Sequence, residues 1–510
     1  MIAGLLAGAV GVCVGYLVAG FTGPVGNPVV AVGEAAIDLS PPPVKDFAIR
    51  NFGSHDKLVL EIGVLVVLAL FVAVIGLRAQ RRLWEGLAGL AVFAAIGMAA
   101  AGTRPTATPG DLLPTLIGSA AAAIVLIMLV QASGAAVFAS PAARRAGQAS
   151  TATPTVTPRR QFLTMSAVAA GGSAVAFVGG RLLAEREAVT AAERALHFRA
   201  PARLATLPPG VDLHIPGLSS FVTPDSAFYR VDTAIVLPQI PPSSWQLRIH
   251  GMVRRELTLT FDQLIRRPLI EDYITLCCVS NPVAGPYIGN ARWLGVSLGA
   301  LLRDAGIQAG ADQLYCTSFD GFTSGTPVQT AMDGRDAMLA VAMNGQPLPV
   351  AHGFPVRTVV PGLYGYVSAC KWIIDIEVTT YAKNVAYWAQ RGWSQQGPIK
   401  TESRIDVPSG QNSLQPGNAK IAGVAWAQHK GIDAVEVRVD NGPWLQATLA
   451  AVPGIDTWRQ WVVDWDATPG SHRIESRATD ATGYTQTSLE EPTAPNGASG
   501  YPMVSVSVSN

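Results

Sequence analysis

The centre of the chain carries the run Thr275-Leu276-Cys277-Cys278-Val279-Ser280-Asn281, with Pro282 directly after it. The apolar residues predict a strand, and the proline predicts that a loop follows it. Successive side chains on a strand point to opposite faces, so only one of the two thiols can serve a given site. A thiolate at a strand end suits a soft, high-valent metal. A buried cysteine is also an ordinary small apolar residue, so the run alone leaves both interpretations open.

Further motifs follow this run in a fixed order. They are GNARWLGV at 289–296, MNGQPLP at 343–349, HGFPVR at 352–357, PGLYG at 361–365 and the pair Lys371-Trp372. The segment Phe228-Tyr229-Arg230 precedes the run. Arginine and lysine form charge-assisted hydrogen bonds with phosphate groups, and glycine lets the backbone approach a ligand closely. Together the motifs favour a bound cofactor over a purely structural cysteine.

In this order the motifs resemble the sulfite oxidase family of molybdopterin enzymes, and the resemblance covers about residues 215 to 490. The T-L-x-C-x-x-N run of the family matches Thr275, Leu276, Cys278 and Asn281. The resemblance therefore implies that Cys278 is the molybdenum ligand and that Cys277 is not. It also implies a mixed α+β cofactor domain followed by an immunoglobulin-like dimerisation domain, and so a homodimer.

The resemblance implies roles for individual residues and a reaction class. The cofactor is expected to be molybdenum-molybdopterin, a molybdenum-bound pyranopterin that ends in a phosphate. Its binding residues would be Tyr229, Arg230, Cys278, Asn281, His352, Arg357 and Lys371. Cys278 and Arg230 would be the catalytic residues, because the family places an arginine near the metal. The expected reaction is a two-electron oxygen-atom transfer to or from a small-molecule substrate.

The sequence also departs from the animal sulfite oxidases. Pro282 and Val283 stand where those enzymes carry arginines, and Val341 stands where they carry a tyrosine. Arg230 is followed by Val231-Asp232 in place of R-N-H. Fewer positive donors and one more carboxylate disfavour a small dianion such as sulfite. Two alternatives therefore stay open: a sulfoxide or N-oxide reductase of the same fold, and a non-catalytic membrane receptor or scaffold that retains the fold.

The first third of the chain has a different composition. Over all 510 residues, 49% are hydrophobic and only 14% are charged, which is low for a soluble protein. Five stretches are long and apolar enough to cross a lipid bilayer: 2–21, 58–77, 83–101, 112–130 and 164–180. We predict a membrane anchor of about five transmembrane helices. The net charge of +1 leaves no basic surface for nucleic acid.

Arginines predict the orientation of these spans, because Lys and Arg are retained on the cytoplasmic side. One cluster, Arg78, Arg81 and Arg82, follows the second span. The other lies between the fourth and fifth spans and consists of Arg144, Arg145, Arg159 and Arg160. Both clusters are inside only if the N-terminus is inside, which places everything after the fifth span outside the cytoplasm. The stretch 158–163, PRRQFL, resembles a twin-arginine export signal, although two positive-inside arginines explain it equally well.

The whole pattern predicts a multi-pass plasma-membrane protein with an extracytoplasmic catalytic domain. The expected order is an N-terminal transmembrane α-helical bundle (1–180), an α+β sulfite-oxidase-type molybdopterin domain (200–406) and an all-β immunoglobulin-like sandwich (407–510). Within the last two we expect short helices at 257–265 and 298–305 and a hairpin turn at Asn441-Gly442. No histidine lies in a predicted span, so the spans are expected to hold no haem and to serve as an anchor or docking platform. The resembling region lacks the haem-binding domain of the animal enzymes, which implies an external electron-transfer partner, a cytochrome or a quinone.

Overall fold

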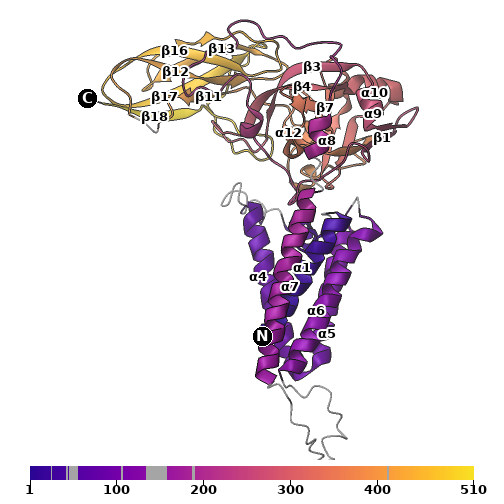
Figure 1. The fold of residues 1–510 in the computed structure, drawn as a ribbon. Helices are drawn as coiled ribbons and strands as arrows, with labels where there is room; N and C mark the ends of the chain where they lie inside the picture. The colour runs from indigo at the N-terminus through magenta and orange to yellow at the C-terminus, as the bar shows by residue number, and fades with distance from the viewer. Residues whose placement is uncertain are drawn as a thin grey trace, which may run out of the picture. The chain divides into compact units, whose positions relative to one another are not determined.

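A computed structural model describes residues 1–23, 26–41, 44, 47, 56–104, 107–133, 158–186, 190–410 and 413–509. Arg144 and Arg145 of the predicted orientation signal lie outside the described residues. The chain divides into two compact units (Figure 1). The first unit contains Met1–Ala188 and Ala234–Pro238, and the second contains Val189–Thr233 and Gln239–Asn510. Each unit is described by itself below.

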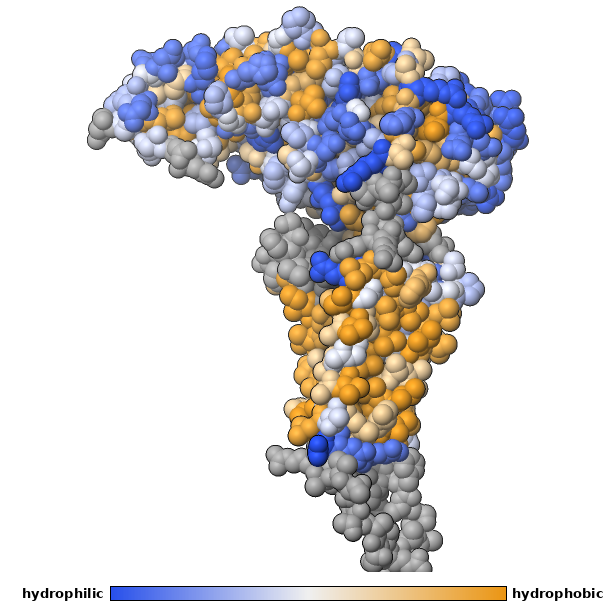
Figure 2. Space-filling model, in the orientation of Figure 1, coloured by the Kyte–Doolittle hydropathy of each residue, from blue (hydrophilic) through white to orange (hydrophobic). Residues whose placement is uncertain are grey.

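The first unit is a helical bundle. Its elements are α1 (Ile2–Thr22), α2 (Pro28–Leu39), α4 (Asp56–Arg81), α5 (Leu83–Gly102), η3 (Pro109–Leu112), α6 (Leu113–Ala132) and α7 (Pro158–Arg186). Five segments are long and apolar enough to cross a membrane: Ile2–Thr22, Ile62–Arg81, Leu83–Gly102, Pro109–Ala132 and Arg160–Leu183. Each of them overlaps one of the five predicted spans. In Figure 2 the helices of this unit present an almost continuous apolar surface.

Glycines allow the helices of the bundle to touch backbone to backbone. A methyl group on Gly4 of α1 would collide with the Val72 carbonyl oxygen and Gly76 of α4. One on Gly118 of α6 would collide with the carbonyl oxygen of Gly11 on α1. Small residues at such contacts are typical of helices that associate within lipid, where close van der Waals packing replaces the hydrophobic effect.

The contacts inside the bundle fix the relative directions of its helices. Gly180 of α7 lies against Leu17 of α1, and Phe162 near the start of α7 packs in the same cluster as Ala3. α1 and α7 therefore run parallel. The N-terminal end of α1 also lies beside the C-terminal end of α4, since Gly4 contacts Gly76. Arg78, Arg81, Arg82 and Arg160 consequently belong to the end of the bundle at which α1 begins.

The helix α2 is an element that the sequence analysis did not predict. Its N-cap is Asn27, whose side-chain oxygen accepts a hydrogen bond from the N–H of Val29 at 3.0 Å, and Pro28 occupies its first position. A methyl group on Gly15 of α1 would lie 3.0 Å from the Pro28 ring. Gly15 precedes the end of α1 by about two turns, so the chain folds back along the bundle before α2 begins.

The second unit begins with an α+β region built on two sheets. One sheet has the strand order β2-β1-β10-β5-β6, and the other has the order β3-β4-β7-β8, with β9 paired to β7. The strands are β1 (Gln246–Gly251), β2 (Leu257–Thr260), β3 (Leu269–Cys277), β4 (Ile288–Ser297), β5 (Gln313–Ser318), β6 (Thr323–Pro327), β7 (Met338–Met343), β8 (Gln346–Pro347), β9 (Arg357–Val359) and β10 (Ile373–Thr379).

Short helices connect these strands. They are α8 (Thr190–Ala195), η4 (Asp225–Ala227), α9 (Phe261–Ile265), α10 (Leu298–Ala305), α11 (Val328–Met332), η5 (Val350–His352), α12 (Gly365–Ser368) and η6 (Ala389–Arg391). The helix predicted at 298–305 is present and ends at Gly306 in a left-handed conformation. The helix predicted at 257–265 begins only at Phe261. Leu257 and Leu259 pair with β1 as a strand, and Thr260 forms a capping box with Gln263.

Two four-stranded sheets complete the second unit. Their orders are β11-β12-β16-β15 and β14-β13-β17-β18, and apolar residues of both sheets share one core. The strands are β11 (Glu402–Val407), β12 (Gly417–Trp426), β13 (Ile432–Val439), β14 (Leu445–Gln446), β15 (Thr448–Leu449), β16 (Arg459–Ala467), β17 (Gly470–Asp480) and β18 (Met503–Val508). We refer to this part as the sandwich.

The hairpin turn between β13 and β14 differs from the predicted turn by one residue. The residues with positive φ are Asp440 and Asn441, at 51° and 59°, and the N–H of Gly442 donates to the Val439 carbonyl at 2.8 Å. The central pair of the turn is therefore Asp440-Asn441 and not Asn441-Gly442. Both residue types tolerate the left-handed region, which explains why the turn can form one position earlier.

Candidate active site

The cysteine run stands at the end of β3, in the register that its pairing with β4 imposes. The two strands are antiparallel along the whole of β3, and Cys277 lies opposite Ile288. Beyond the strand, the N–H of Cys278 still donates to the carbonyl oxygen of Tyr287 at 2.9 Å. The N–H of Asn281 then donates to the Cys278 carbonyl at 3.0 Å and closes a turn. Backbone hydrogen bonds thus fix Cys278 on both sides.

The side chain of Asn281 is held on one side only. Its Oδ1 accepts a hydrogen bond from the N–H of Tyr287 at 2.8 Å, and Gly285 leaves room for this oxygen because a methyl group there would collide with it. Its Nδ2 is buried and has no hydrogen-bond partner among the described residues. A buried donor without a partner is costly, so this amide is suited to donating to a bound ligand.

The two thiols lie in different surroundings. Cys277 is fully buried, and its pKa is raised well above the usual value by burial and by the nearby Glu402 of the sandwich. Burial also raises the pKa of Cys278, but hydrogen bonds from Ser280 oppose this rise. Since Thr275, on the same face as Cys277, also contacts the sandwich, Cys277 faces away from the cofactor domain core. The assignment of the metal to Cys278 and not to Cys277 stays a prediction.

Phe228 and Tyr229 connect the cysteine run with the HGFPVR motif. The Phe228 ring stacks on Tyr229 at 5.3 Å and meets the His352 ring edge-on at 5.5 Å, both measured between centroids. The pKa of the Tyr229 phenol is raised by burial and by Cys278 and Cys277, while Arg357 opposes the rise. The Tyr229 hydroxyl lies close to Gly365, because a methyl group on this glycine would be in van der Waals contact with it at 3.6 Å. Residues about 125 positions apart therefore meet at one place.

His352, Arg357 and Lys371 form a buried cluster of one imidazole and two cations. Nε2 of His352 lies 3.2 Å from the carbonyl oxygen of Asp225, and Nη1 of Arg357 donates to the His352 carbonyl at 3.0 Å. The Arg357 guanidinium also lies over the Trp293 ring. Gly353, with φ 110°, makes this approach possible, because a methyl group there would lie 3.0 Å from Cβ of Arg357 and 3.2 Å from Lys371.

Asp232 joins Lys371 to Arg230. Its Oδ2 accepts a hydrogen bond from Nζ of Lys371 at 2.9 Å and one from Nε of Arg230 at 2.8 Å. The Asp232 side chain is only 2% exposed and that of Lys371 is 10% exposed, whereas Arg230 is 43% exposed. Arg230 is therefore the member of this group that faces solvent.

The pKa values in the cluster show an excess of buried positive charge. Burial, reinforced by Arg357, lowers the pKa of His352 to about 4, so this side chain is neutral at pH 7. Burial lowers the pKa of Arg357 to about 10. It lowers that of Lys371 to about 8 even though Asp232 favours the charged form. A buried cation is stabilised by an anion at hydrogen-bond distance, so the cluster fits the phosphate end of a cofactor.

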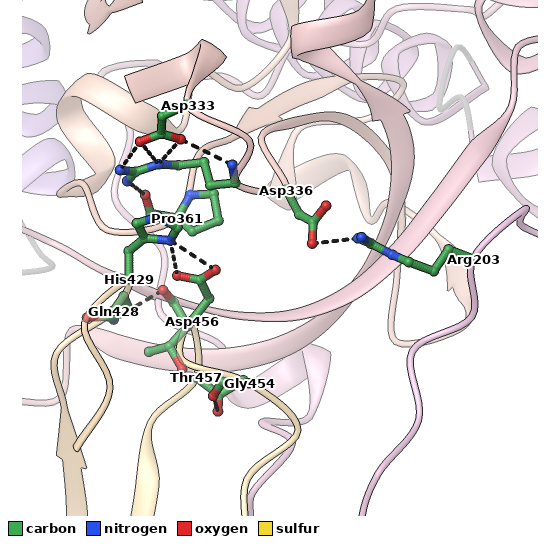
Figure 3. Close-up of polar contacts among 11 residues, drawn as sticks. Arg203, Asp333, Asp336, Pro361, Gln428, His429, Gly454, Asp456 and Thr457 are labelled. Atoms are coloured by element: carbon green, nitrogen blue, oxygen red, sulfur yellow. Dashed lines mark hydrogen bonds and ion pairs between the residues drawn. The ribbon is translucent and has the colours of Figure 1, made fainter. Parts of the chain in front are cut away.

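Residues of the sandwich form hydrogen bonds with strand β3. The Thr275 hydroxyl donates to Oδ1 of Asn290 at 3.0 Å and accepts a hydrogen bond from the N–H of Trp458 at 2.7 Å. The Thr275 N–H donates to the Asp456 carbonyl at 2.9 Å. Figure 3 shows how two sandwich loops, with His429 and Asp456, meet Pro361 and its neighbours on the cofactor side. Strand β3, and hence Cys278, is fixed by residues from both parts of the unit.

All seven predicted site residues belong to the second unit. Phe228 contacts Tyr229 and His352, Asp232 pairs with Arg230 and Lys371, and Asn281 hydrogen-bonds to Cys278 through its backbone N–H. Gly362 of the PGLYG motif lies against Arg335 and His429. Sequence reasoning missed the role of Asp232 as shared partner of two cations, although it noted the carboxylate at this position. It also missed the contact of Thr275 with Trp458, for which no local pattern gives a signal.

Comparisons with known proteins identify this region. Residues 234–388 match the family described as oxidoreductase molybdopterin binding domain. Mitochondrial sulfite oxidase of Rattus norvegicus is 29% identical over 274 residues, which cover 45% of this chain and 50% of that protein. NADH nitrate reductase 1 of Oryza sativa subsp. japonica is 32% identical over 189 residues, 31% of this chain and 20% of that protein. The chain thus spans about half the length of the sulfite oxidase it matches.

Among solved structures, the sulfane dehydrogenase SoxCD from Paracoccus pantotrophus is 24% identical, with a TM-score of 0.48, covering 57% of this chain and 82% of that chain. The sequence matches concern the second unit of the chain. The chain contains a molybdopterin-binding oxidoreductase domain, similar to the sulfite oxidases, and its cofactor is the molybdenum cofactor. The orphaned Asn281 amide and the buried cations fit that cofactor on their own chemistry.

Proposed function

We propose that the protein is a membrane-anchored molybdenum-dependent oxidoreductase that catalyses two-electron oxygen-atom transfer. The observation that carries the proposal is that Phe228 and Tyr229 lie between the Cys278 loop and two buried side chains, the His352 imidazole and the Arg357 guanidinium. The two ends of such a cofactor are its metal and its phosphate. The metal needs a thiol ligand, and the phosphate needs hydrogen-bond donors.

In this proposal each residue has a distinct task. Cys278 ligates the metal, and the Asn281 amide donates a hydrogen bond to the cofactor. Arg357, Lys371 and His352 bind the phosphate end, with Gly353 allowing their close approach. Tyr229 lies beside the thiol, and Arg230 faces the substrate, since it is the exposed cation of the group. When bound, the molybdenum cofactor supplies the two-electron oxygen-atom transfer.

The protein's own contribution is to hold the metal-binding thiol in position and to keep water away from it. The hydrogen bonds of Cys278 and Thr275 hold the thiol at a fixed place, and fixed ligands tune a metal through the groups around them. Tyr229 keeps its proton at neutral pH, because burial raises its pKa, and so it can donate a hydrogen bond toward the substrate side. No side chain has to act as a general base for the transfer itself.

The first unit is the membrane anchor in this proposal. Its five apolar helices have the length of a bilayer, and arginines gather at the end where α1 begins. With that end in the cytoplasm, the C-terminal end of α7 lies on the opposite side, so the catalytic domain is extracytoplasmic in the plasma membrane. The sequence RR at 159–160 then serves as an export signal.

Domain bounds and partners belong to the same proposal. The bundle of residues 1–180 is the anchor, residues 200–406 hold the cofactor, and residues 407–510 form an immunoglobulin-like sandwich that mediates homodimerisation. Electrons pass to or from an external carrier, a cytochrome or a quinone. The substrate is a small molecule, and the paired Arg230 and Asp232 favour a sulfoxide or N-oxide over sulfite, which makes a reductase the second candidate.

Metal and pterin analysis of the purified full-length protein tests the proposal. We expect about one molybdenum and one pterin per chain, and Cys278→Ser should lose nearly all of the molybdenum, because a hydroxyl is a poor ligand for a soft site. The matched control is Cys277→Ser, which alters the neighbouring thiol on the sandwich side and should keep the metal. Equal loss in both variants, or wild-type protein without pterin, would contradict the proposal.

A further inference from the structure

Asp232 lies between two cations, the exposed Arg230 and the buried Lys371. One carboxylate oxygen accepts from Nε of Arg230 at 2.8 Å and from Nζ of Lys371 at 2.9 Å. Because its side chain is 2% exposed, water does not screen its negative charge. Arg230 and Lys371 are therefore linked as one ion-paired unit, and neither cation is available with its full charge.

A count of charges shows what remains for a substrate. Arg230, Arg357 and Lys371 contribute three positive charges, and Asp232 contributes one negative charge. A phosphate on the cofactor brings about two more negative charges. His352 contributes none at neutral pH. The loaded site is thus close to neutral, and no net positive charge is left to attract an anionic substrate.

We propose that Asp232 is a specificity-determining positioning residue, which neutralises Arg230 through the shared pair with Lys371 and so makes the site select uncharged oxygen-atom substrates over dianions. The proposal rests on the proposed function, since it concerns the substrate side of that site. The guanidinium of Arg230 keeps its Nη groups for hydrogen bonds, because the ion pair uses Nε. Such a group can bind the polar S=O or N–O oxygen of a neutral molecule through hydrogen bonds, without needing an opposite charge.

The test measures binding of sulfate, an unreactive dianion, to molybdenum-loaded full-length protein in detergent. Thermal-shift titrations are carried out at constant ionic strength, so that only specific binding raises the melting temperature. Wild type should show no saturable effect. Asp232→Asn removes the negative charge and keeps the shape of the side chain, so it should bind sulfate at least about tenfold more tightly. The repulsion between the Asp232 charge and a dianion beside Arg230, in a partly buried site, exceeds the free energy of a tenfold change in affinity.

Three controls make the outcome specific. Asp232→Glu keeps the charge and should behave as wild type. Asp304→Asn removes the carboxylate of another arginine pair, with Arg267 at 2.6 Å, and should not create sulfate binding. The double variant Asp232→Asn with Arg230→Gln restores the net charge and should lose the gained binding. It also keeps the test decisive if Asp232→Asn alone does not fold.

Molybdenum content and substrate kinetics complete the test. Asp232→Asn should retain at least the wild-type molybdenum content, because it adds net positive charge beside the phosphate. Its KM for sulfite should fall, and the ratio of kcat/KM for sulfite to kcat/KM for dimethyl sulfoxide should rise above that of wild type. If loaded wild type already binds sulfate as tightly as the variant, or if the variant loses the cofactor, the role of Asp232 in specificity is wrong. Wild type without molybdenum would instead overturn the proposed function.

Discussion

The helical bundle and the end of β3 are both tightly packed, but by opposite means. In the bundle, glycines allow close contact at particular helix crossings, so that Gly118 and Gly11 bring their backbones together. At the end of β3, polar groups are buried and nearly every one has a partner, as with Thr275. Packing in the bundle depends on complementary shape alone, whereas packing at the end of β3 depends on complementary shape and on satisfied hydrogen bonds. Substitutions in the two regions should therefore fail for different reasons.

The largest effect is expected at Glu402, a buried carboxyl in the sandwich beside Cys277. Burial raises its pKa from 4.5 to about 8, and Oε1 has no hydrogen-bond partner among the described residues. The unfolded chain releases this proton more easily, so stability should fall as pH rises from about 4.5 to 8. Glu402→Gln should remove this loss and stabilise the protein above pH 8 by on the order of 4 kcal/mol.

Thermal unfolding measured from pH 5 to pH 9 checks this expectation. The melting temperature of Glu402→Gln should depend less on pH than that of wild type. Glu490→Gln, at an exposed position of the same unit, is the control and should leave the slope unchanged. Identical slopes for wild type and Glu402→Gln would show that the sandwich side of β3 does not carry an unsatisfied acid.

The next effect concerns the hydrogen bonds of Thr275. Thr275→Val keeps the volume but leaves the Trp458 N–H and Oδ1 of Asn290 without this partner in a fully buried place. We expect a loss of about 3 kcal/mol in the free energy of unfolding, from two buried groups at about 1–2 kcal/mol each. Thr275→Ser keeps the hydroxyl and should lose much less. Chemical denaturation of both variants decides, and equal losses would indicate that methyl packing, not hydrogen bonding, holds the strand.

The smallest effect is expected in the bundle. Gly118→Ala inserts a methyl group where it would collide with the Gly11 carbonyl, and overpacking of this kind costs about 2 kcal/mol. The control is Gly63→Ala on α4, where nothing lies within 4 Å of the new methyl group. Loss of helical circular dichroism on heating in detergent is the measurement. Molybdenum content should stay unchanged in both variants. Equal melting of the two would contradict glycine-mediated packing.

The sequence predicted best what local patterns encode. The five apolar segments each coincide with a long helix, because hydropathy and length are properties of one continuous stretch. The ordered motifs likewise identified His352, Arg357 and Lys371, which the fold does place together. The helix predicted at 257–265, in contrast, was too long, because Thr260 is the N-cap of a helix that begins at Phe261.

What could not be predicted depends on partners distant in the chain. The pairing of Asp232 with Lys371 joins residues on different elements, and no periodicity connects them. The helix α2 was missed because its 12 residues are too few to span a membrane and give no spanning signal. The turn at Asp440 shifted by one residue because two neighbouring positions tolerate positive φ equally well.

The hydrogen bond from Trp458 to Thr275 also bears on how each molecule is made. A ribosome synthesises the bundle and the cysteine run long before it reaches residue 458. Until then the Thr275 hydroxyl lacks its hydrogen-bond donor, and the sandwich residues that pack against strand β3 are absent. We therefore expect the cofactor to be inserted after translation has passed Trp458, and a chain that stops before this residue should be unable to retain molybdenum.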